Sequence, residues 1–123
     1  MTRQKLSSLS VEDLVALFVA NRLKQDQAEL AMETRKFRPL YREMVAIRDE
    51  LRSRPGDQRH ALVALLDHPN KEVRLNAAKS VVTIAPTAAR KALEEVAASR
   101  HYPQAAEAQM SIESLDDGTW VPT

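Results

Sequence analysis

The second half of the chain repeats itself at an interval of 31 residues. Shifting residues 61–84 forward by this interval places small and apolar side chains onto others of the same kind. The matched positions are Ala61 with Ala92, Leu62 with Leu93, Leu65 with Val96, Leu66 with Ala97, Ala77 with Ala108, Val81 with Ile112, and Ile84 with Leu115. A period of this size is typical of stacked helix–turn–helix units, which act by presenting a surface. We therefore expect a helical fold that ends in two related units.

Helix signals extend over the remainder of the chain. The sequence has only two glycines in 123 residues and is rich in alanine, which favours helix. Apolar spacing, prolines and capping residues such as Ser10 and Asn70 predict helices over residues 10–31, 34–54, 57–67, 70–84, 86–99 and 102–117. The predicted fold is all-α, with these helices paired as three stacked antiparallel hairpins.

One domain is expected over residues 1–123. It comprises a long N-terminal hairpin (10–54), a first repeat unit (57–84), a degenerate second unit (86–117) and a tail (118–123). The apolar faces of the two long helices are predicted from helical spacing to be Val11, Leu14, Val15, Phe18 and Leu23, and then Phe37, Leu40, Tyr41, Met44, Ile47 and Leu51. Pro39 leaves two alternatives for the second helix, a kink or a true start at this residue.

Residues 65–78 read LLDHPNKEVRLNAA and resemble a HEAT-type helical repeat. In that family two leucines end the first helix, a proline-containing turn follows, and a valine–arginine pair precedes small alanines that allow close packing. The usual turn aspartate is replaced here by His68, so the resemblance does not carry the family's aspartate–arginine bond over to Arg74. The second unit has Ala105 at the position of Arg74.

Residues 9–18 and 54–79 together resemble a family of short bacterial proteins of unknown function with a HEAT- or armadillo-like fold. The resemblance implies an α–α superhelix for nearly the whole chain. It also implies one alternative function, because some small families of this kind are thought to be immunity proteins that neutralise secreted toxins.

Charge is distributed unevenly although the net charge is only +1. Residues 35–59 hold eight basic side chains against four acidic ones, whereas residues 94–123 hold six acidic side chains against Arg100 alone. Four arginines of the basic stretch form two pairs, each four residues apart on one helix face, and are candidate partner-binding residues: Arg38, Arg42, Arg48 and Arg52. Either this is a solvated, salt-bridged face, or these side chains and Arg35 bind the phosphates of a nucleic acid. The interspersed acidic residues favour the first interpretation.

Trp120 is the sole tryptophan and follows the last predicted helix. It is a fifth candidate partner-binding residue, because tryptophan is enriched at binding hot spots. The alternative is that it folds back and covers the end of the helical stack.

No residue pattern predicts catalysis or a bound metal or cofactor. The chain has no cysteine, and His60, His68 and His101 are isolated in sequence. Adjacent carboxylates such as Glu12 and Asp13 point about 100° apart on a helix, so they do not converge on a substrate. We expect a protein that is not an enzyme and has no cofactor.

The resulting functional hypothesis is a protein-interaction module with one protein partner. No apolar run approaches the roughly 20 residues needed to span a bilayer, and acidic residues interrupt the first apolar stretch. A cytoplasmic location without membrane contact is therefore expected. Toxin neutralisation and, as the weaker alternative, nucleic-acid binding through residues 35–59 stay open.

Overall fold

The structure is a computed structural model that describes residues 6–123. Its elements are, in chain order, α2 (Val11–Leu30), α3 (Thr34–Ser53), the 3₁₀-helix η1 (Gln58–Asp67), α4 (Lys71–Ser80), α5 (Pro86–Ala98) and α6 (Gln104–Asp117). Each of the six predicted helices overlaps one of these elements, and residues 6–123 contain no strand. The all-α fold class is confirmed.

Two compact units share the chain, one ending at Ala61 and the other beginning at Leu62. The domain prediction covered residues 1–123, of which residues 1–5 lie outside the described part. No described helix combines the length and the apolar character that crossing a membrane requires.

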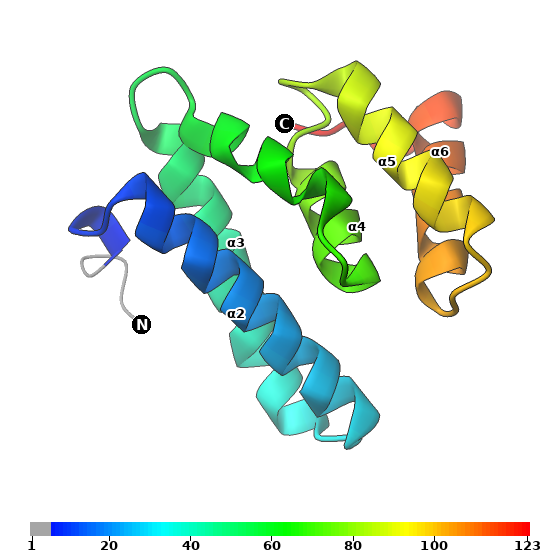
Figure 1. Cartoon of the computed structure of the whole chain (residues 1–123), viewed down its shortest axis with the longest axis horizontal. Coiled ribbons are helices and arrows are strands. Elements are labelled where there is room, and N and C mark those ends of the chain that lie inside the picture. Colours follow the sequence, from blue (N-terminus) through cyan, green and yellow to red (C-terminus); the bar gives the residue numbers. More distant parts are fainter. Residues whose placement is uncertain (1–5) are drawn as a thin grey trace. The chain divides into compact units, whose positions relative to one another are not determined.

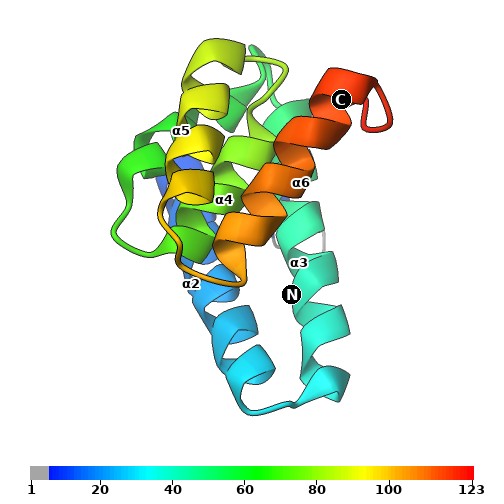
Figure 2. The ribbon, with the colours of Figure 1, turned by 90° about the vertical axis from the view of Figure 1, so that its right-hand side faces the viewer.

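The N-terminal unit is dominated by a hairpin of the two longest helices. Figures 1 and 2 show α2 and α3 side by side, joined by the short turn after Leu30. The predicted cap is confirmed, since the Asp13 N–H donates to Ser10 Oγ at 3.1 Å. Helix α3 begins at Thr34 and continues through Pro39, so the proline does not mark its first turn.

The seam of this hairpin is apolar at its two ends and polar in the middle. Five of the six buried residues of α2 recur at alternating intervals of four and three, and the sixth is Arg22. The five are Leu14, Phe18, Asn21, Gln25 and Ala28. On α3 the same spacing gives Met44, Ile47 and Leu51. Such spacing keeps one face of each helix against its partner. The sequence prediction placed Leu23 on this face and was wrong, because Leu23 lies five residues after Phe18 and falls outside the spacing of four and three. Leu23 is exposed.

A buried polar layer occupies the middle of the seam. Gln25 Nε2 donates to Asn21 Oδ1 at 2.6 Å, and the Arg22 guanidinium donates to Gln25 Oε1 at 2.6 Å. Across the hairpin, Asn21 Nδ2 donates to the Leu40 carbonyl at 2.9 Å, and Gln25 Nε2 lies 3.6 Å from Met44 Sδ. Polar groups at a seam position satisfy one another only in one register, so this layer aligns α2 with α3.

The break after α3 is a turn stabilised by an ion pair. Gly56 adopts a φ of +79° and Asp57 a φ of +50°. The Asp57 carboxylate accepts hydrogen bonds from the Arg59 guanidinium at 2.7 and 2.9 Å and from the Arg59 N–H at 3.3 Å. These bonds start η1, which has 3₁₀ geometry and begins one residue after the predicted boundary.

The C-terminal unit packs α4, α5 and α6 together. Asn70 caps α4 as predicted, since its Oδ1 accepts from the N–H groups of Glu72 and Val73. The predicted extension of α4 to Ile84 is wrong, and the helix ends at Ser80. All four residues that follow it are β-branched and therefore weak helix formers: Val81, Val82, Thr83 and Ile84.

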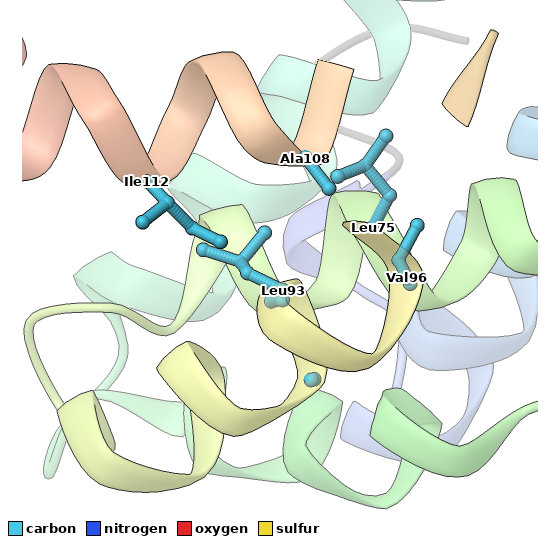
Figure 3. Packing of buried hydrophobic residues seen from close by; sticks show 7 residues of the cluster. Leu75, Leu93, Val96, Ala108 and Ile112 are labelled. Carbon is cyan, nitrogen blue, oxygen red and sulfur yellow. The ribbon is translucent and has the colours of Figure 1, made fainter. Parts of the chain in front are cut away.

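The repeat identified in the sequence is reproduced in the burial of side chains. Leu75, Leu93, Val96, Ala108 and Ile112 form one apolar cluster from α4, α5 and α6 (Figure 3). Six of the seven matched pairs share a burial class, either both buried or both half-buried; only Ala61, half-buried, differs from the buried Ala92. The period therefore marks equivalent packing positions.

Candidate interaction surface

The turn of the N-terminal hairpin exposes large apolar side chains. Leu30 and Met32 are each 85% exposed, and Tyr41 is 48% exposed, although the sequence had placed Tyr41 on the apolar face of its helix. The N–H groups of Met32 and Glu33 donate to the carbonyls of Glu29 and Ala28, which closes α2 with a Schellman-type cap. This geometry puts Met32 in the left-handed region, with a φ of +56°, and projects it from the turn.

A hollow lies beside the turn. It has a volume of about 510 Å³ and is lined by Ala28, Glu29, Met32, Thr34, Phe37 and Arg38. Its apolar lining comes from both helices and from the turn, so the hairpin itself shapes it. A second open hollow borders the same end of the hairpin and is more polar, with Lys24, Glu33, Arg35 and Lys36 among its lining residues.

Three exposed arginines lie in the first half of α3, towards the same end of the hairpin. Arg35, Arg38 and Arg42 form no hydrogen bond or ion pair with any residue from 6 to 123. Arg38 and Arg42 lie one helical turn apart, on either side of Tyr41 in sequence. We define the hairpin tip as the surface formed by Leu30, Met32, Arg35, Phe37, Arg38, Tyr41 and Arg42.

The four predicted arginines do not form one surface. Arg48 is ten residues after Arg38, about 15 Å along the helix axis, and its Nε lies 3.8 Å from Asp49 Oδ1. Arg52 is exposed near the C-terminal end of α3. The structure therefore brings Arg38 and Arg42 to the hairpin tip and leaves Arg48 and Arg52 outside it.

The carboxylates of the acidic C-terminal stretch are each engaged within the unit. The pairs are Glu94 with Arg90, Glu95 with Arg74, Glu107 with Lys79, Glu113 with Gln109, Asp116 with Arg90, and Asp117 with Thr119. Arg90 contacts Asp116 through two bonds of 2.6 and 3.0 Å. Hydrogen bonding from Arg90 lowers the pKa of Asp116, and hydrogen bonding from Thr119 lowers the pKa of Asp117.

Trp120, the remaining predicted residue, lies against its own unit. Its backbone N–H donates to the Ser114 carbonyl at 3.1 Å, and this bond turns the tail back along α6. The ring is half-buried, and Lys79 Nζ lies 6.0 Å from its centroid. Lys79 also pairs with Glu107 at 3.4 Å, so these contacts link α4, α6 and the tail.

Sequence reasoning missed the apolar members of the hairpin tip. Leu30 and Met32 fall outside the seam spacing, and they stand next to the predicted end of a helix. An apolar run at a turn, where polar residues are usual, was the available signal.

Comparisons with known proteins place the chain among proteins of the same fold. A model of a domain of unknown function (DUF2019) matches residues 12–116. The crystal structure of the protein RPA1889 from Rhodopseudomonas palustris CGA009 is 44% identical in sequence, with a TM-score of 0.93. The alignment covers 96% of this chain and 98% of that chain. No protein of curated function matches.

Proposed function

The chain belongs to the DUF2019 family, a domain of unknown function, and we propose that it acts as a protein-interaction module that binds through the hairpin tip. One observation carries the proposal. The tip combines strongly exposed apolar side chains with arginines that have no partner among the described residues.

Burial would stabilise a complex at this surface. Removing a Leu or Met side chain from water contributes about 1.5–3 kcal/mol, and Leu30 and Met32 are almost fully hydrated. Tyrosine and arginine are enriched among the residues that dominate binding energies, and the tip contains both. The short seam behind the tip is held by the polar layer, so the surface is ordered before a partner arrives.

Site-specific photo-crosslinking in the native cell tests this function. The photoreactive residue p-benzoylphenylalanine replaces Met32 in one variant and Met110 in the other. Met110 is the matched control, because it is also an exposed methionine (65%) but lies on α6. We expect a discrete protein adduct from position 32 and none from position 110. An adduct from position 110 alone would disprove the location, and no adduct from either would disprove the function.

The proposal includes a HEAT-like repeat in the second half of the chain and a non-enzymatic, cytoplasmic role. Matching burial at positions 31 residues apart supports the repeat. Arg74 supports it in a modified form. Its Nε donates to the Leu66 carbonyl at 3.2 Å and its guanidinium lies 3.6 Å from Glu95, so it joins consecutive helices without the family's turn aspartate.

A further inference from the structure

We infer that the segment bound by the hairpin tip is an acidic protein segment in which two carboxylates flank an apolar side chain. This inference rests on the proposed function and specifies the chemistry of the partner. Its carrying observation is that Arg38 and Arg42 lie one turn apart on α3 and that Arg38 also borders the apolar hollow.

The spacing of the two central arginines defines the partner's pattern. Arg38 and Arg42 are four residues apart on α3, about 6 Å between Cβ atoms. Each guanidinium can bind one carboxylate through two parallel hydrogen bonds. Arg38 also borders the hollow formed with Met32 and Phe37. When an apolar side chain of the partner enters this hollow, two carboxylates of the same segment can reach Arg38 and Arg42. This requires the two carboxylates to lie about one helical turn apart.

The C-terminal acidic stretch of a second copy of this chain does not supply such a segment. This stretch on α5 and α6 offers six carboxylates, and each already contacts a group of its own unit. Transferring Asp116 to Arg38 of another copy would break two bonds with Arg90 to form two others. Such an exchange provides no net gain, so the acidic stretch of a second copy is a poorer source of these carboxylates than a different protein.

A nucleic acid fits the tip less well than an acidic protein segment. Glu29 lines one hollow and Glu33 the other, so a continuous phosphate chain would pass beside two carboxylates. A segment with two carboxylates brings fewer negative charges to this surface than a continuous phosphate chain does. The strongly exposed Leu30 and Met32 also have no role in binding phosphates.

The test places p-benzoylphenylalanine at Tyr41, between the two arginines, in the full-length protein and in native cells. Mass spectrometry then identifies the crosslinked peptide. We expect a segment of another protein with two Asp or Glu residues within about one helical turn of an apolar residue. A synthetic peptide of that segment then serves as the probe for affinity measurements.

Measuring the peptide affinity of charge variants tests the role of the two arginines quantitatively. The double variant Arg38→Glu and Arg42→Glu is expected to weaken peptide binding about tenfold, with a smaller salt dependence. Lys91→Glu, a change of an exposed cation on α5, is the matched control and should leave affinity unchanged. Replacing the two acidic residues of the peptide by their amides should also weaken binding to the unmodified protein, but by less, because it removes the attraction without adding repulsion.

The outcomes separate this inference from the proposed function. A tip-bound segment without carboxylates, or affinity that ignores both arginines, would overturn the charge pattern while the interaction function stands. An adduct that nuclease removes, or one with a second copy of the chain, would overturn the inference in favour of those partners. Absence of any adduct from both Met32 and Tyr41 would remove the function itself.

Discussion

The two charged regions of this protein differ in how their charges are used. In the C-terminal unit, Arg90 and Lys79 hold carboxylates of α6, so an acidic sequence becomes an internally paired surface. At the hairpin tip, Arg38 and Arg42 face solvent without ion pairs among residues 6–123. A count of charges describes both regions equally well. The difference between them is that the C-terminal unit pairs its charges internally, whereas Arg38 and Arg42 have no partner among residues 6–123.

The largest expected difference concerns the apolar residues of the two regions. Leu93 is fully buried in the cluster of Figure 3, so Leu93→Ala should lower the free energy of unfolding by about 2–5 kcal/mol. Met32→Ala at the tip should change it by less than about 0.5 kcal/mol. Chemical denaturation of both variants measures this. Equal losses would show that Met32 belongs to the core.

The polar layer should show the next largest effect. Gln25→Ala removes an acceptor from Arg22 and a donor from Asn21 inside the seam, and should cost about 1–3 kcal/mol. The matched change Gln109→Ala breaks one exposed bond to Glu113 and should be nearly neutral. Thermal unfolding of the two variants tests this, and an unchanged stability of Gln25→Ala would mean that the layer is dispensable.

The next smaller difference in stability is expected between two arginines of the N-terminal unit, Arg54 and Arg38. Arg54 donates to Glu50 Oε2 at 3.0 Å and to the Leu6 carbonyl at 3.1 Å, so Arg54→Ala should cost about 1–2 kcal/mol. Arg38 has no such bonds, and Arg38→Ala should leave stability within about 0.5 kcal/mol. If Arg38→Ala were as destabilising as Arg54→Ala, its side chain would have a structural partner and the contrast between the regions would fail.

The smallest effect is a pH dependence in the C-terminal unit. Hydrogen bonding from Arg90 holds the pKa of Asp116 below its usual value of 3.8. The stabilisation is therefore fully present above pH 3.8 and is lost as pH falls through the lower pKa of the folded state. A carboxyl NMR titration should show the Asp116 pKa rising towards 3.8 in Arg90→Ala. An identical midpoint in both proteins would mean that the pair does not form in solution.

Sequence reasoning predicted the elements of the fold well because their signals are local. Ser10 and Asn70 cap helices by contacting residues two or three positions away, and spacing identified most of the buried apolar residues. It failed at Leu23, where a hydrophobic residue lies on the exposed face and Asn21 and Gln25 occupy the seam. Polar residues are buried there only because they bond to one another, and this pairing is invisible to a hydrophobicity pattern.

The candidate site was only partly predictable. Arg38 and Arg42 were identified from their spacing, but so were Arg48 and Arg52, which lie outside the tip. Whether an arginine is free depends on partners distant in sequence, as Arg90 and Asp116 illustrate with a separation of 26 residues. The exposure of Leu30 and Met32 depends on what packs over them, and the one local signal for it was an apolar run at a turn.

The cap that closes α2 has a consequence for how this hairpin could be redesigned. Glycine is the usual residue at the left-handed position of a Schellman motif, because it has no Cβ to strain the backbone. Here Met32 occupies it, at a cost of about 1 kcal/mol or more relative to an unstrained turn. A glycine at this position would relieve the backbone strain and stabilise the turn. It would also remove the exposed methionine side chain. Residue 32 therefore determines both the stability of the turn and the apolar surface on which the proposed function depends.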